Sequence, residues 1–196
     1  AIYLSPLRLM ALENQERIES MGVPCSLVTG EEEIIREGAT HYCCTVEEFA
    51  RFRHESWDVV VIDEVQMMAD SQRGWAWVDA LVSAYTQDLI MTGPELIQPS
   101  LKTLCDLCED QLVVKRTKRL SPVDVARRAT TLKQLDAGSM LVAFSRKTVL
   151  ELKAMLEMTG KSVSVVYGAL SPEVRREQAR RFREGEADLM VATDAV

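Results

Sequence analysis

The chain has 196 residues, of which 47% are hydrophobic and 27% charged, a balance typical of a folded globular protein with one large or two small domains. No apolar run reaches the roughly 20 residues that a membrane-spanning helix needs, so we expect no membrane association. The net charge of −7 disfavours a uniformly basic nucleic-acid-binding protein, although a local basic groove is compatible with it. The odd number of cysteines, 5, favours free thiols over a disulfide framework.

Short apolar segments alternate with helical segments along the whole chain. Most of the apolar segments lack a polar alternation, which is typical of strands covered by helices on both faces. The pattern therefore predicts an α/β fold with open parallel sheets between helices. The predicted strands are residues 1–4, 24–28, 41–45, 59–62, 88–92, 112–115, 140–144, 163–166 and 189–192.

Local signals mark where the helices begin and end. Serine followed by proline suits a helix start, because serine caps the free N–H groups and proline fits the first position. This pair occurs at Ser5, Ser121 and Ser171, and Thr45 with Glu48 has the spacing of a capping box. Expected helix ends are marked by glycines, namely Gly22, Gly138, Gly160 and Gly185.

The chain divides into two predicted lobes. A basic run at 115–119 leads into a predicted linker helix, and a new series of strands begins at Met140. We therefore expect a first lobe over residues 1–120, a linker helix within 121–138 and a second lobe over 139–196.

Two adjacent carboxylates, Asp63 and Glu64, follow the apolar strand at 59–62. Ligands of open α/β sheets bind at the carboxyl ends of strands, and two acids there suit Mg²⁺–phosphate chemistry. One carboxylate can hold the metal through water while the other orients a water that attacks a phosphate. The alternative is an acidic strand end that simply turns into solvent.

The stretch Asp63-Glu64-Val65-Gln66 resembles motif II, the Walker B box, of superfamily-2 helicases. Glutamine in fourth place, the following Met67-Met68, and the segments 6–13 and 73–77 resemble the mitochondrial degradosome RNA helicases of the suppressor-of-var type and their bacterial relatives. The resemblance spans nearly the whole chain and implies RecA-like lobes that use ATP and Mg²⁺.

The resemblance also implies roles for individual residues at the nucleotide. Asp63 would bind Mg²⁺ through water, Glu64 would activate the attacking water, and Gln66 would sense the nucleotide. Thr92 and Gly93 occupy the strand end where many relatives have Ser-Ala-Thr, which implies a coupling role. Asp194, in a segment similar to motif V, would link the nucleotide to the nucleic acid.

The expected nucleic-acid contacts begin with Arg8. A cation in the first turn of a helix opposes the helix dipole, so this placement favours a phosphate ligand, with pairing to a surface acid as the alternative. Thr45 is explained equally well by helix capping, and Trp75 and Trp77 favour packing over base stacking. By resemblance, the contacts are Pro6, Leu7, Arg8, Thr29, Gly30, Thr45, Ser145, Arg146 and Thr193.

The chain contains no Gly-x-x-x-x-Gly-Lys-Ser/Thr phosphate loop, or Walker A, and no motif VI. We therefore expect a fragment, an incomplete first lobe with the start of a second, that does not hydrolyse ATP by itself.

The parent would be an ATP-dependent RNA helicase that acts on single-stranded or partly duplex RNA, with an exonuclease as a degradosome partner. It would be cytoplasmic if bacterial and mitochondrial if eukaryotic. The alternatives are a superfamily-2 DNA helicase or translocase and a non-catalytic binding module with a helicase fold.

Overall fold

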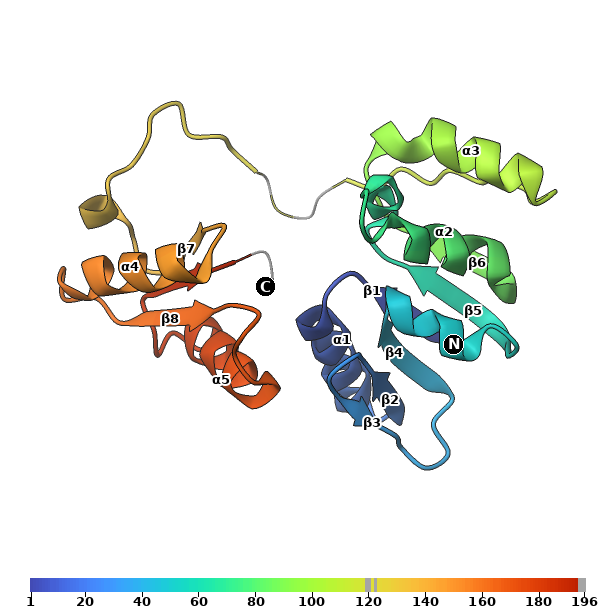
Figure 1. Ribbon diagram of the computed structural model, residues 1–196, viewed down its shortest axis with the longest axis horizontal. Helices are drawn as coiled ribbons and strands as arrows, with labels where there is room; N and C mark the ends of the chain where they lie inside the picture. Colours follow the sequence, from blue (N-terminus) through green and yellow to red (C-terminus); the bar gives the residue numbers. More distant parts are fainter. Residues whose placement is uncertain (119–120, 122, 194–196) are drawn as a thin grey trace. The chain divides into compact units, whose positions relative to one another are not determined.

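The computed structural model describes residues 1–118, 121 and 123–193. The chain forms two compact units, Ala1–Val114 and Lys115–Val196, and each contains a β-sheet flanked by helices (Figure 1). None of the helices in the described residues is both long and apolar enough to cross a lipid bilayer.

The sheet of the first unit contains, within the described residues, six strands in the order β3-β2-β4-β1-β5-β6. Neighbouring strands are parallel except β2 and β3, which are antiparallel. Because β1 lies between β4 and β5, the carboxyl ends of these three strands meet at one edge of the sheet. The strands are β1 (Ile2–Ser5), β2 (Cys25–Val28), β3 (Glu33–Ile34), β4 (His41–Thr45), β5 (Ser56–Ile62) and β6 (Tyr85–Met91).

Helices cover both faces of this sheet (Figure 1). Helix α1 (Arg8–Ser20) packs on β2 and β4, whereas α2 (Gly74–Ser83) packs on two 3-10 helices, η1 (Val46–Phe52) and η2 (Val65–Ala69). The core on the α2 side joins the inward residues of β1 and β5 to the buried Trp77 of α2. The unit ends with η3 (Glu95–Ile97) and α3 (Gln98–Leu107).

The second unit contains a parallel sheet, β7 (Ser139–Val142), β9 (Leu189–Ala192) and β8 (Val163–Val166), in that order. Alternate residues of β9 face opposite helices: one set packs with α4 (Arg146–Glu157) and the other with α5 (Pro172–Arg183) (Figure 1). The predicted α/β architecture with helices on both faces is confirmed in this unit.

The predicted strand at 112–115 is wrong. No strand follows α3 among the described residues up to 118, and β3 was not predicted. Glu109, in the left-handed conformation with φ 62°, turns the chain after α3. Val113 is 78% exposed, so the apolar run that suggested a strand has no sheet beside it to pair with.

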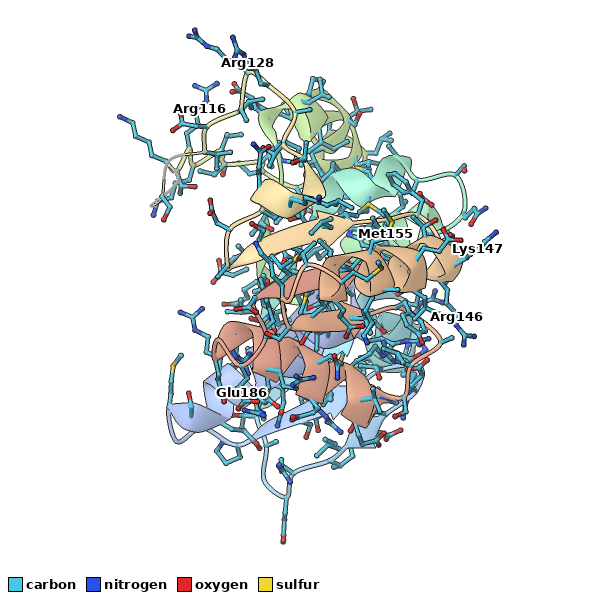
Figure 2. All side chains as sticks on the ribbon, turned by 90° about the vertical axis from the view of Figure 1, so that its left-hand side faces the viewer. Arg116, Arg128, Arg146, Lys147, Met155 and Glu186 are labelled. Atoms are coloured by element: carbon cyan, nitrogen blue, oxygen red, sulfur yellow. The ribbon has the colours of Figure 1, made fainter. Side chains whose placement is uncertain are left out.

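The predicted linker helix within 121–138 is also wrong. The described part of this segment contains one short 3-10 helix, η4 (Leu132–Gln134), closed by a capping box from Thr131. Most helical stability comes from packing of an apolar face, and here the apolar side chains of Val123 and Val125 are exposed. Arg128 projects away from this segment (Figure 2). Ser121, the expected cap of this helix, directly precedes residue 122, which lies outside the described residues.

Two predicted helix starts need correction. Ser5 continues the β1 ladder opposite Thr45, and α1 begins only at Arg8 after the extended Leu7. In the described structure Thr45 makes no capping bond, and the helix that follows it, η1, is a 3-10 helix whose buried Val46, Phe49 and Phe52 follow the three-residue period. By contrast, Ser171 caps α5 as predicted, and the expected helix-end glycines have positive φ, including 83° at Gly22.

Candidate functional site

The carboxylate pair lies directly after β5, at the sheet edge where the parallel strands end. The Asp63 backbone N–H donates to the Leu4 carbonyl oxygen at 2.9 Å, which extends the ladder between β1 and β5 by one residue. Asp63 is 9% exposed, whereas Glu64 is exposed and adopts the left-handed conformation with φ 51° and ψ 49°. That conformation costs about 1–3 kcal/mol for a residue other than glycine. The turn thus holds one carboxylate inside the fold and presents the other to solvent.

The Asp63 carboxylate is held by three donors. Its Oδ2 accepts from the Tyr3 hydroxyl at 2.7 Å, and its Oδ1 accepts from the Glu64 backbone N–H at 2.9 Å and from the Thr92 hydroxyl. Burial and the bond to Asp63 raise the pKa of the Tyr3 hydroxyl above its ordinary value, so Tyr3 remains a donor. A carboxylate offers about four lone-pair sites, so one remains for a water bound to a metal ion.

Thr92 and Gly93 follow β6 and close over the same turn. The Thr92 carbonyl oxygen accepts from the Val65 backbone N–H at 2.8 Å. A Cβ atom on Gly93 would lie 2.9 Å from Val65 Cγ1 and 3.0 Å from Gln66 Oε1, so only glycine fits without displacing the box. The structure therefore brings together the residues predicted for catalysis and for coupling in the first unit.

Gln66 completes this turn. Its Nε2 donates to the Glu64 carboxylate. Its Oε1 is buried, and no described residue donates a hydrogen bond to it. Buried polar atoms usually have partners, so this acceptor is suited to a ligand or a water at the carboxylates.

Two residues of this site, Arg73 and Trp77, were not predicted as functional. Trp77 is fully buried, and its Nε1 donates to the Asp63 carbonyl oxygen at 2.9 Å. The Arg73 guanidinium lies over the Trp77 ring, 5.4 Å from the centroid, and donates to the Pro6 carbonyl oxygen at 2.7 Å. The sequence identified Trp77 as a packing residue, but nothing in its local pattern indicated a bond to the box.

The predicted nucleic-acid residues of the first unit gather where β1, β2 and β4 end. Arg8 forms an ion pair with Glu31, and a Cβ atom on Gly30 would lie 3.6 Å from Arg8 Nη2. Thr29 Oγ1 accepts from the Glu32 backbone N–H at 3.0 Å and so organises the turn. Thr45 is buried at the end of β4, opposite Ser5, and Pro6 and Leu7 follow Ser5 in the chain. Arg8 thus has the acidic partner that was the alternative to a phosphate, and its phosphate contact stays a prediction.

In the second unit, the predicted residues also follow strand ends. Ser145 caps α4 by accepting from the Thr148 backbone N–H at 3.1 Å, and Arg146 lies over the Tyr167 ring, 5.4 Å from the centroid. Figure 2 shows Arg146 at the outer surface near the start of α4. Thr193 donates its backbone N–H to Val166 O at 3.0 Å beyond β9. Asp194, the predicted link to the nucleotide, lies outside the described residues.

Comparison with protein families matches both units. Residues 1–117 match the family described as the DEXQ-box helicase domain of Suv3, and residues 124–196 match the helicase conserved C-terminal domain.

Individual relatives match the chain over nearly its full length. The mitochondrial ATP-dependent RNA helicase SUV3 of Saccharomyces cerevisiae is 38% identical over 203 residues, covering 99% of this chain and 27% of that protein. The mitochondrial ATP-dependent RNA helicase SUPV3L1 of Mus musculus is 35% identical over 202 residues, covering 100% of this chain and 26% of that protein. The chain thus spans about a quarter of the length of these relatives.

Solved structures share the fold at lower identity. Saccharomyces cerevisiae Dbp5 bound to RNA and ADP BeF3 has a TM-score of 0.71 and 18% identity, covering 100% of this chain and 57% of that chain. Mycobacterium smegmatis helicase Lhr bound to ssDNA and AMP-PNP has a TM-score of 0.70 and 17% identity, covering 99% of this chain and 33% of that chain. At these identities the likeness establishes the RecA-like fold alone.

Proposed function

This chain belongs to the family of Suv3-type DEXQ-box helicases, and we propose that it is part of an ATP-dependent RNA helicase that couples ATP hydrolysis to movement on RNA or its unwinding. The observation that carries the proposal is the Asp63 carboxylate, fixed by three donors beside the solvent-facing Glu64. This arrangement supplies one immobile and one accessible acid at the carboxyl end of a buried strand.

Mg²⁺ fits these residues. Mg²⁺ keeps much of its hydration shell and binds proteins through one or two carboxylates, which suits the single unfilled acceptor site of Asp63. When bound, the ion neutralises negative charge on the phosphates. Glu64 orients a water and accepts its proton, while Gln66 and Thr92 hold the two carboxylates in place.

We propose RNA as the nucleic acid, single-stranded or partly duplex, because the relatives that span this chain are named RNA helicases. Its backbone would lie along the turns after β1, β2 and β4, where Arg8, Thr29 and Gly30 gather. The proposal includes an exonuclease partner. The location is mitochondrial in a eukaryote, as in the names of the relatives, and cytoplasmic in a bacterium.

The test is the ATPase activity of the full-length protein with Glu64→Gln and a matched control. Glu64→Gln keeps the side-chain size but removes the proton acceptor, so we expect kcat to fall on the order of 10²-fold or more. Glu37→Gln makes the same chemical change at an exposed residue outside the site and should leave kcat unchanged. Equal activity of the two variants would contradict the assigned role of Glu64.

The choice of nucleic acid is tested with RNA and DNA strands of one sequence. We expect RNA to stimulate ATP hydrolysis more than DNA, with an affinity that falls as salt rises because backbone phosphates are bound. Stronger stimulation by DNA would favour the DNA translocase instead. A full-length protein with no ATPase activity at any RNA concentration would indicate a non-catalytic binding module.

A further inference from the structure

Arg73, just before α2, connects three parts of the first unit. Its Nη2 donates to the Pro6 carbonyl oxygen at 2.7 Å and its Nε donates to Glu47 Oε1 at 2.7 Å. Its guanidinium plane also lies over Trp77, 5.4 Å from the ring centroid. Only a planar side chain with several N–H donors in a fixed fork can make these contacts together. The guanidinium therefore joins the chain after β1 to η1 and α2.

Trp77 continues this connection to the carboxylates. The indole is fully buried, and its Nε1 donates to the Asp63 carbonyl oxygen at 2.9 Å. The backbone of Asp63 is consequently held by Leu4 through its N–H and by Trp77 through its carbonyl group. A shift of the indole would therefore move the peptide between Asp63 and Glu64.

The start of α2 has little freedom to absorb such a shift. Gly74 approaches the backbone of η2 so closely that a Cβ atom would lie 2.4 Å from the Met68 carbonyl oxygen. Its N–H also donates to the Asp70 carbonyl oxygen at 3.0 Å. Closely packed elements transmit displacement rather than damp it. Arg73 is thus anchored next to a rigid point of the chain.

We propose that Arg73 and Trp77 are positioning residues that couple nucleic-acid binding at the Pro6–Arg8 segment to the geometry of the Asp63-Glu64 box. This inference rests on the proposed function. A phosphate that binds Arg8 displaces the nearby Pro6 carbonyl group. Arg73 transfers that displacement to the Trp77 indole, which in turn moves the Asp63 carbonyl group. Coupling between two sites typically changes affinity by about 5- to 150-fold, and it is reciprocal.

The test compares Arg73→Gln with Arg53→Gln in the full-length protein. Arg53 pairs with Asp79 of α2, so each variant removes one ion pair between the α2 region and the η1 region, part-buried for Arg73 and exposed for Arg53. Only Arg73 also contacts Pro6 and Trp77. We expect similar melting temperatures, but at least about 5-fold loss of RNA stimulation for Arg73→Gln and none for Arg53→Gln.

Binding measurements give a readout independent of turnover. RNA affinity is measured by fluorescence anisotropy with and without a non-hydrolysable ATP analogue. Reciprocity requires that Arg73→Gln reduce the effect of the analogue on RNA affinity by the same factor as the effect of RNA on analogue affinity. If the analogue changed RNA affinity by the same factor in Arg73→Gln and Arg53→Gln, the inference would be overturned.

A double-mutant cycle with Trp77→Phe tests whether the two residues act in one path. Phenylalanine keeps a buried ring but removes the N–H that donates to Asp63. We expect the double variant to lose no more RNA stimulation than the stronger single variant, whereas fully additive losses would overturn the shared path. A wild-type protein that RNA does not stimulate would overturn the proposed function as well. A stimulated wild type with a fully stimulated Arg73→Gln would overturn this inference alone.

Discussion

Replacing Gly74 with alanine tests whether the start of α2 is as tightly packed on η2 as the structure indicates. The new Cβ atom would lie 2.4 Å from the Met68 carbonyl oxygen, whereas ordinary contacts begin at 3.4 Å. The backbone must therefore move by about 1 Å, an overpacking that costs about 1–3 kcal/mol. Alanine's better helix propensity returns at most about 1 kcal/mol. We expect a net loss of about 1–2 kcal/mol, or roughly 5- to 30-fold in the folding equilibrium.

Gly30→Ala is the matched control in the same unit. A Cβ atom there would meet its nearest neighbours at 3.6 Å, an ordinary contact, so we expect a change within about 0.5 kcal/mol. Urea denaturation followed by tryptophan fluorescence measures the difference, because Trp57, Trp75 and Trp77 all lie in the first unit. Equal midpoints and slopes for the two variants would refute the close approach of Gly74 to η2.

Three further predictions concern single polar contacts. Glu31→Gln releases Arg8 from an exposed ion pair worth at most about 1 kcal/mol. Fluorescence anisotropy should therefore show RNA binding up to about 5-fold tighter at low salt. Weaker binding would contradict a phosphate contact at Arg8. Because the raised pKa of Tyr3 lets the folded state keep a proton that the unfolded state loses, stability should fall as the pH rises above about 10. Tyr3→Phe should flatten that fall in urea titrations, and an unchanged slope would argue against the bond to Asp63. Ser145→Asp keeps a good N-cap, so the thermal unfolding temperature should be unchanged. RNA binding should weaken because the added negative charge repels the phosphates. Unchanged RNA affinity would indicate that Ser145 only caps α4.

Much of the carboxylate site could be predicted because its information is local. The apolar residues before Asp63 predict a buried strand, and a parallel sheet places its carboxyl end beside those of its neighbours. Ser171 and Gly22 similarly mark helix ends through the conformations that they favour. The same kind of local signal predicted a linker helix that the structure does not contain. A helical pattern forms a stable helix only where another surface covers its apolar side.

What the sequence determined by itself is the alternation of strands and helices and the position of the two acids directly after a strand. The tertiary structure alone decided which distant groups hold those acids. Tyr3 is 60 residues from Asp63, and Arg73 is 67 residues from Pro6. Side-chain periodicity indicates only which residues of one helix or strand share a face. These contacts between distant residues depend instead on the strand order and on the packing of α2 against η2.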